Sequence, residues 1–265
     1  MIDFGIGFLG WLAGTAIPAL FGLLLITGVG RRVKAKYLAA FALGIFMWFF
    51  VDTISGSADL DVSAGFAGGI DQVAMVALFV LGALFFSSVG GNPFSPDSAT
   101  GKVTLTIPIL VAMAVGVHGL GEGTAFGSTA SSTTSTSLLD AFGGLAAGMA
   151  YFLHKALEPM MIGVCYVSYS RDRATKAMGY LGDVVLLTLL FVTPSLVGAA
   201  TGYYISYDAS YFFALGTGTS TYAALRLARP LFVNTEASSS SGSIKVALSL
   251  VFGFLCIYFA ALFHS

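Results

Sequence analysis

Two pairs of histidine and glutamate in the middle of the chain have the spacing of a metal site. His118 and Glu122 are four residues apart, and so are His154 and Glu158. On a helix, residues four apart lie on one face, one turn apart, so each pair presents an imidazole beside a carboxylate. Imidazole and carboxylate together suit a borderline divalent ion such as Zn²⁺, which takes four ligands in a tetrahedron. These four side chains are therefore candidate metal ligands.

The same pairs also have a purely structural interpretation. Buried hydrogen bonds between histidine and glutamate can hold membrane helices together. One such pair arises often by chance, whereas two pairs on successive segments, with two carboxylates to balance two positive charges, favour a metal ion.

The composition of the chain is that of a membrane protein. Of its 265 residues, 57% are hydrophobic and only 9% are charged, whereas a soluble domain has about a quarter charged residues. The net charge of -1 and the lack of any basic run exclude nucleic acid as a partner. Cys165 and Cys256 lie in apolar stretches and indicate no disulfide framework.

Apolar segments of about 20 residues, the length that crosses a bilayer as a helix, recur along the whole chain. They predict an all-α integral membrane protein with eight transmembrane helices in a single domain, residues 1–265. The first span follows no basic segment and is expected to be retained. The predicted spans are residues 4–28, 37–58, 70–90, 103–127, 138–168, 178–202, 210–232 and 244–264.

Eleven of the twelve basic residues fall in alternate connections between these spans. The other connections and both ends have no Lys or Arg. By the positive-inside rule, the basic connections are cytoplasmic and both termini lie outside the cell, in a multi-pass protein of the plasma membrane. The eleven are Arg31, Arg32, Lys34, Lys36, Lys102, Arg171, Arg173, Lys176, Arg226, Arg229 and Lys245.

The twelfth basic residue, Lys155, lies inside the fifth predicted span, and Asp52 lies inside the second. Asp52, His118 and His154 are each about 24 to 26 Å along a helix from the basic residue at its cytoplasmic end. Charge at this depth is expensive, so these groups are expected to face the bundle interior and to mark a function.

Weaker candidates extend inward from this level. Met161 and Cys165 continue the helical face of the second pair and could pass a metal ion inward, although both residues are also ordinary packing residues at this spacing. Asp183, near the cytoplasmic boundary, is either an exit group or an interfacial charge.

On the outer side, Asp52, Ser55 and Asp59 share one face of the second span. We interpret them as an access vestibule, in which Asp59 is simply solvated. Irregular backbone is expected near the site as well, because glycines surround the first pair and Pro159, which removes a helical hydrogen bond, follows the second.

At these residues the chain resembles the ZIP (Zrt-, Irt-like) family of divalent metal transporters. Residues 118–123, His-Gly-Leu-Gly-Glu-Gly, are similar to the family's His-Asn-x-x-Glu-Gly, and residues 154–158 to its second His-x-x-x-Glu. The sixth span, with Pro194, and the eighth span also resemble their family counterparts.

The resemblance implies a bundle in which helices one to three and six to eight are inverted repeats around helices four and five. It also implies import of a divalent metal ion through a site made of His118, Glu122, His154 and Glu158. Zinc is the first choice of substrate, with iron, manganese and cobalt as alternatives, and no organic cofactor is implied.

The chain departs from the family at a second, adjacent metal site. The family's ligand positions for that site hold Gly119, Lys155 and Thr193 here, so the second site is expected to be absent. We interpret the Lys155 ammonium as a substitute for the charge of the second metal ion.

The sequence thus predicts a transporter and not an enzyme, since four protein ligands leave no open position for an activated water. One alternative is a non-transporting ZIP-like subunit that serves as a scaffold in a larger complex. Another is a proton-coupled carrier of a different solute, with Lys155, Glu158 and Asp52 as the relay. The many glycines permit close helix packing within or between subunits, so the sequence does not distinguish a monomer from a homodimer.

Overall fold

The computed structural model describes residues 2–57, 70–90, 105–169, 177–205, 207–233 and 240–262. In these ranges every regular element is helical, which confirms the predicted all-α class for the described part. The helices are α1 (Phe4–Gly30), α2 (Ala35–Ser57), α3 (Ile70–Val89), α4 (Thr106–Gly116), α5 (Gly119–Ser132), α6 (Leu138–Ala141), α7 (Leu145–Tyr169), α9 (Ala177–Tyr204), α10 (Ala209–Val233) and α11 (Ser240–Ala261).

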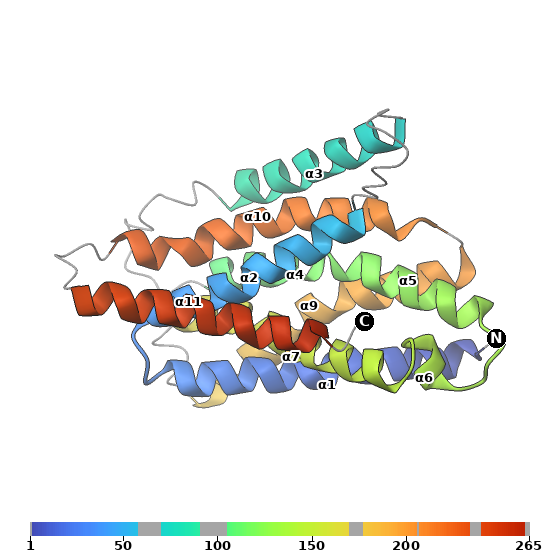
Figure 1. Cartoon of the computed structure of the whole chain (residues 1–265), viewed down its shortest axis with the longest axis horizontal. Coiled ribbons are helices and arrows are strands. Elements are labelled where there is room, and N and C mark those ends of the chain that lie inside the picture. Colours follow the sequence, from blue (N-terminus) through green and yellow to red (C-terminus); the bar gives the residue numbers. More distant parts are fainter. Residues whose placement is uncertain are drawn as a thin grey trace.

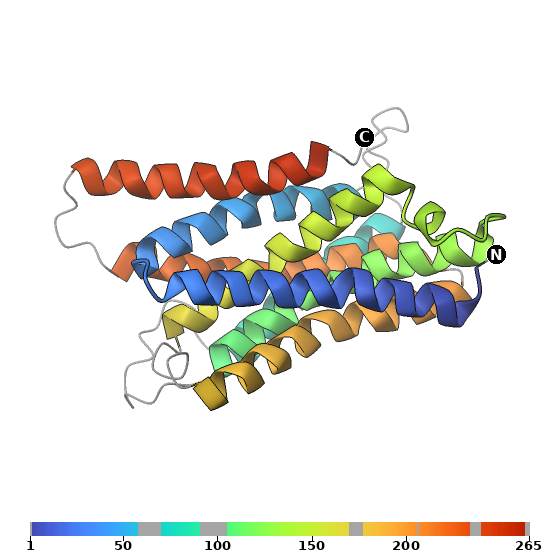
Figure 2. The same ribbon diagram turned by 90° about the horizontal axis from the view of Figure 1, so that it is seen from below.

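The long helices run back and forth along the longest axis of the molecule (Figures 1 and 2). Helices α1, α7 and α10 end at one end of the bundle, where α2, α9 and α11 begin. The N-terminus and the loop between α5 and α6 lie at the opposite end. We call this opposite end the N-terminal end of the bundle.

Within the described residues, five helical segments are long and apolar enough to cross a membrane, so the protein is a multi-pass membrane protein. Large apolar side chains such as Leu9, Leu81 and Phe252 are more than half exposed, as expected for a surface that faces lipid. The five segments are Phe4–Gly30, Ala35–Ile54, Thr106–Ser132, Gly179–Tyr204 and Gly242–Ala260.

The predicted span 103–127 corresponds to the apolar segment Thr106–Ser132. A two-residue turn at Val117 and His118 divides it into α4 and α5, in agreement with the irregular backbone expected around the first pair. The predicted span 138–168 starts too early, because Gly143 and Gly144 adopt positive φ angles of 80° and 98° and separate α6 from α7. Helix α7 then continues through Pro159 to Tyr169.

Helices α5 and α9 touch along a seam of glycines. Gly123 and Gly127 of α5 face the backbone of α9, and Gly198 and Gly202 of α9 face the backbone of α5. A Cβ atom at any of the four would collide with the opposing main chain. Because lipid provides no hydrophobic drive between helices, such close van der Waals contact is what holds membrane helices together.

Glycines in contact with a facing backbone also join other pairs of neighbouring helices. Gly22 of α1 lies against the backbone of α7, and Gly44 of α2 and Gly253 of α11 lie against each other's helices. Gly82 of α3 and Gly218 of α10 make the equivalent contact. The bundle around the interior polar groups is therefore built on backbone contacts that tolerate no added side-chain volume.

We expect the substitution Gly202→Ala to lower the stability of the purified protein by about 1 to 3 kcal/mol, because the new methyl group must displace the facing backbone of α5. Gly28→Ala is the matched control, since a Cβ atom there meets open space. Thermal unfolding in detergent measures both variants. Equal unfolding temperatures for the two variants would contradict the claim that the glycine contacts between α5 and α9 tolerate no Cβ atom.

Candidate metal-binding site

Five ionisable side chains from two helical segments form one cluster in the interior of the bundle. His118 lies at the turn between α4 and α5, and Glu122 lies in the first turn of α5. His154, Lys155 and Glu158 belong to α7, which packs against α4. All but Glu122 are at most 5% exposed, and the Glu122 side chain is 15% exposed. The structure therefore brings the two predicted pairs together.

The ligand atoms of this cluster lie close to one another. Nε2 of His118 is 3.0 Å from Oε1 of Glu158 and 3.6 Å from Oε1 of Glu122. One ligand atom from each of these three residues lies within 4.8 Å of the others. Two ligands of a tetrahedral zinc ion are about 3.3 Å apart, so these three atoms need only small shifts to share an ion.

His154 joins the cluster through Glu158 and not through the first histidine. Its Nε2 is 2.7 Å from Oε1 of Glu158, the same oxygen that faces His118. Both imidazoles therefore converge on one carboxylate oxygen. His154 needs a larger movement than the other three ligands to reach a shared ion.

Lys155 binds the opposite edge of both carboxylates. Its Nζ is 2.5 Å from Oε2 of Glu122 and 2.5 Å from Oε2 of Glu158, and 3.1 Å from Nε2 of His118. Each glutamate thus directs Oε1 to the histidines and Oε2 to the ammonium. A buried ammonium is tolerated only when it is paired in this way, because it has lost its water.

The orientation of His118 is fixed from several sides. Its Nδ1 lies within hydrogen-bonding reach of the Val115 carbonyl, which can only accept, so Nδ1 carries a proton and Nε2 is directed toward the carboxylates. The Phe49 ring meets the imidazole edge-on at 4.5 Å, and Gly216 of α10 lies against the backbone of His118. Nε2, the atom that a metal ion would use, lies between Nζ of Lys155 at 3.1 Å and Oε1 of Glu158 at 3.0 Å.

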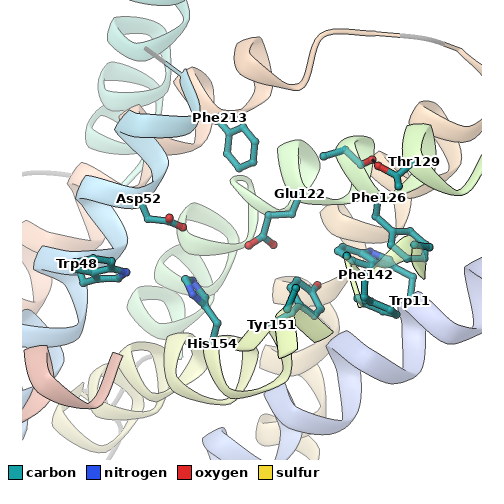
Figure 3. Close-up of a pocket in the computed structure, with 14 residues that line it drawn as sticks. Trp11, Trp48, Asp52, Glu122, Phe126, Thr129, Phe142, Tyr151, His154 and Phe213 are labelled. Carbon is teal, nitrogen blue, oxygen red and sulfur yellow. Dashed lines mark hydrogen bonds between the residues drawn. The ribbon is translucent and has the colours of Figure 1, made fainter. Parts of the chain in front are cut away.

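A cavity of about 620 Å³ extends from the cluster toward the N-terminal end of the bundle. Figure 3 shows Asp52, Glu122 and His154 pointing into the same space from α2, α5 and α7. Asp52, which is exposed, therefore shares this cavity with Glu122 and His154. The cavity is also lined by a group of aromatic side chains: Trp11, Trp48, Phe126, Phe142, Tyr151 and Phe213.

Three of the weaker pathway candidates, Met161, Cys165 and Asp183, are not among the residues that line this cavity. Met161 and Cys165 are buried in the main apolar core. Asp183 is buried and accepts a hydrogen bond of 2.8 Å from the Tyr166 hydroxyl. Ser55 belongs to α2, and Asp59 lies outside the described residues.

The aromatic lining is the part of the site that sequence reasoning missed. Phenylalanine and tyrosine are so common in membrane helices that their positions carry little information. The one usable signal was tryptophan, since the chain has only two, Trp11 and Trp48, and both line the cavity.

No family model matches the chain, and no curated protein matches it. The interpretation of the site therefore depends on its chemistry. With neutral imidazoles, the carboxylates of Asp52, Glu122 and Glu158 and the ammonium of Lys155 leave two negative charges. A divalent cation would balance them.

We expect Lys155→Met to destabilise the protein by about 3 to 5 kcal/mol, because it leaves two buried carboxylates without their shared cation. Adding Glu122→Gln should restore part of the loss. Lys245→Met removes an exposed lysine of α11 and serves as the control. Thermal unfolding is the measurement, and a Lys155→Met variant as stable as the control would show that the ammonium is not paired as described.

Proposed function

We propose that the protein is a membrane transporter that passes a divalent transition-metal ion through His118, Glu122, His154 and Glu158. The observation that carries this proposal is the buried cluster, in which ligand atoms of His118, Glu122 and Glu158 lie within 4.8 Å of one another. Glu122 and His154 also line a cavity in the apolar helical bundle. Zinc fits two imidazoles and two carboxylates best, and iron, manganese and cobalt accept the same ligand types.

The position of the cavity supports a direction of transport. Its walls include residues of the first half of α1, the second half of α5 and the turn after α6, at the N-terminal end of the bundle. Beyond the cluster, toward the other end, Met161 and Cys165 are packed in the core. A site open on one side and closed on the other is what alternating access requires. The positive-inside rule makes the open side the outside, with both termini there, and the movement import across the plasma membrane.

The packing of the helices supports a ZIP-like bundle of eight spans. Helix α1 packs on α7 as α9 packs on α5, and α2 packs on α11 as α10 packs on α3. In an inverted repeat, α1, α2 and α3 correspond to α9, α10 and α11, and α7 corresponds to α5. Under this correspondence the contact of α1 with α7 becomes that of α9 with α5, and the contact of α2 with α11 becomes that of α10 with α3.

Three helices complete the proposed count of spans. Helix α3 has a shorter apolar segment, Val73–Val89, and α7 and α10 carry interior charges. Helices α7 and α10 have 25 residues each. At 1.5 Å per residue this is about 37 Å, which exceeds the hydrocarbon thickness of a bilayer.

The position of Lys155 determines how many metal ions the proposed site can hold. Its ammonium contacts the Oε2 atoms of Glu122 and Glu158, whereas the histidines contact the Oε1 atoms. A second metal ion bridging the same two carboxylates would need these oxygens. We therefore assign one metal ion to the site and the role of the second cation to Lys155.

The same ion pairs favour one alternative function. Lys155 and Glu158 are in direct contact, and Asp52 faces the same cavity, so protons could pass between them without a metal ion. Such a protein would be a proton-coupled carrier of another solute. Proton flux into proteoliposomes in the absence of any transition metal would identify it.

Replacing Glu122 or His154 by alanine should abolish uptake of the metal ion into proteoliposomes, because each change removes a ligand. The fold should persist, since Lys155 keeps its contact with Glu158. Asp208→Ala, at an exposed position before α10, is the control and should transport as the wild type does. Undiminished uptake in both ligand variants would refute the assignment.

Uptake should also fall as the external pH is lowered from about 7.5 to about 5.5, because a protonated imidazole cannot bind a metal ion and its positive charge repels one. Initial rates measured at a constant membrane potential test this direction. A rate that rises on acidification would point instead to the proton-coupled alternative.

A further inference from the structure

The cavity beside the cluster is lined by a group of aromatic side chains, which are not ligands for a bare metal ion. Six aromatic side chains line it, against the three ionisable side chains of Asp52, Glu122 and His154. A hydrated divalent ion is best served by oxygen ligands and water. A cavity of about 620 Å³ with apolar walls and a few polar groups instead has the size and composition of a pocket for an organic ligand.

The aromatic walls are held in place by their neighbours. Trp11 stacks on Phe126, Phe142 and Tyr151, with centroid distances of 4.4, 5.6 and 4.7 Å. Its Nε1 donates a hydrogen bond of 2.9 Å to Ser195. These contacts form a rigid aromatic wall at the end of the cavity away from Asp52 (Figure 3).

Two other rings stand near the carboxylate of Asp52. Figure 3 shows Trp48 and Phe213 on either side of Asp52, around the space into which Asp52 points. Trp48 meets Tyr258 edge-on at 5.3 Å, and Phe213 packs over Gly121, where a Cβ atom would collide with the ring. Both rings are therefore supported from outside the cavity.

The charge of Asp52 is available to a ligand. Glu122 and Glu158 are paired with Lys155, whereas Asp52 makes no salt bridge within the part of the chain that the structure describes. A carboxylate beside aromatic faces binds organic ammonium ions, because ring and charge both attract the cation while the rings replace its weakly held water.

The chain already places one alkylammonium among such groups. Nζ of Lys155 lies 5.7 Å from the centroid of the Tyr151 ring and 5.3 Å from that of Phe191, in addition to its two carboxylates. An ammonium held by rings and carboxylates is thus stable in this part of the bundle.

We propose that the part of the cavity formed by Trp48, Asp52 and Phe213 binds a small organic cation, either a quaternary ammonium or a protonated amine. Its positive charge is balanced by Asp52, and its alkyl groups contact the two rings. A cation bound there covers the approach to Glu122 and His154. On the proposed function, it therefore competes with the metal ion.

Intrinsic fluorescence provides a direct readout, because both tryptophans of the chain line the cavity. We would titrate the purified protein with choline and with 3,3-dimethylbutan-1-ol, its uncharged isostere. A saturable change with choline and none with the alcohol is expected. The same response to both compounds would overturn the proposal, since it would show that charge plays no part.

Variants then locate the site. Asp52→Asn should weaken choline binding about tenfold or more, because it removes the negative charge that balances the quaternary ammonium, and Asp208→Asn should bind as the wild type does. Trp11→Phe should keep the fluorescence change, which Trp48 would report. Trp48→Leu should bind radiolabelled choline about fivefold more weakly in equilibrium dialysis. Binding unaffected by Asp52→Asn or by Trp48→Leu would contradict the proposal.

The outcome separates this inference from the proposed transport. Choline binding by a protein that takes up no metal ion would support the cation site and overturn the transport proposal. Metal uptake that choline does not inhibit, together with no binding in dialysis, would overturn the cation site alone.

Discussion

The pairing of Lys155 with Glu122 and Glu158 is the interaction on which the rest of the interior depends. Three charges in a medium with almost no water are stable only while they stay in contact. Their contact fixes α7 against the turn between α4 and α5, and it orients the Oε1 atoms of both glutamates toward His118. The glycine seams allow this approach, because they bring helix backbones together without intervening side chains.

Much of this arrangement could be predicted from the sequence, because it follows from periodicity. Most helices begin and end within a few residues of the predicted spans, and the spacing of four residues placed His118 with Glu122 and His154 with Glu158. The glycines around the first pair predicted irregular backbone there but not the exact position of the turn at Val117, and the late start of α7 could not be predicted. Each depends on local backbone geometry, the positive φ angles of Gly143 and Gly144 in the second case.

Periodicity also fails to distinguish a surface that lines a cavity from one that is packed. Met161 and Cys165 share a helical face with the cluster, yet both lie in the core, whereas the aromatic residues of the cavity follow no pattern that separates them from ordinary membrane residues. The cavity and the cluster share Glu122 and His154. A ligand in the aromatic part would therefore lie beside the ionisable cluster.

The most direct test of the account is the metal content of the purified protein. We would compare the wild type with a Glu122→Gln/Lys155→Met/Glu158→Gln variant, which removes two ligands without leaving a buried ammonium unpaired. The account predicts one divalent ion per chain in the wild type and none in the variant. Equal metal content in both proteins, or two ions bound between Glu122 and Glu158 in the wild type, would contradict it.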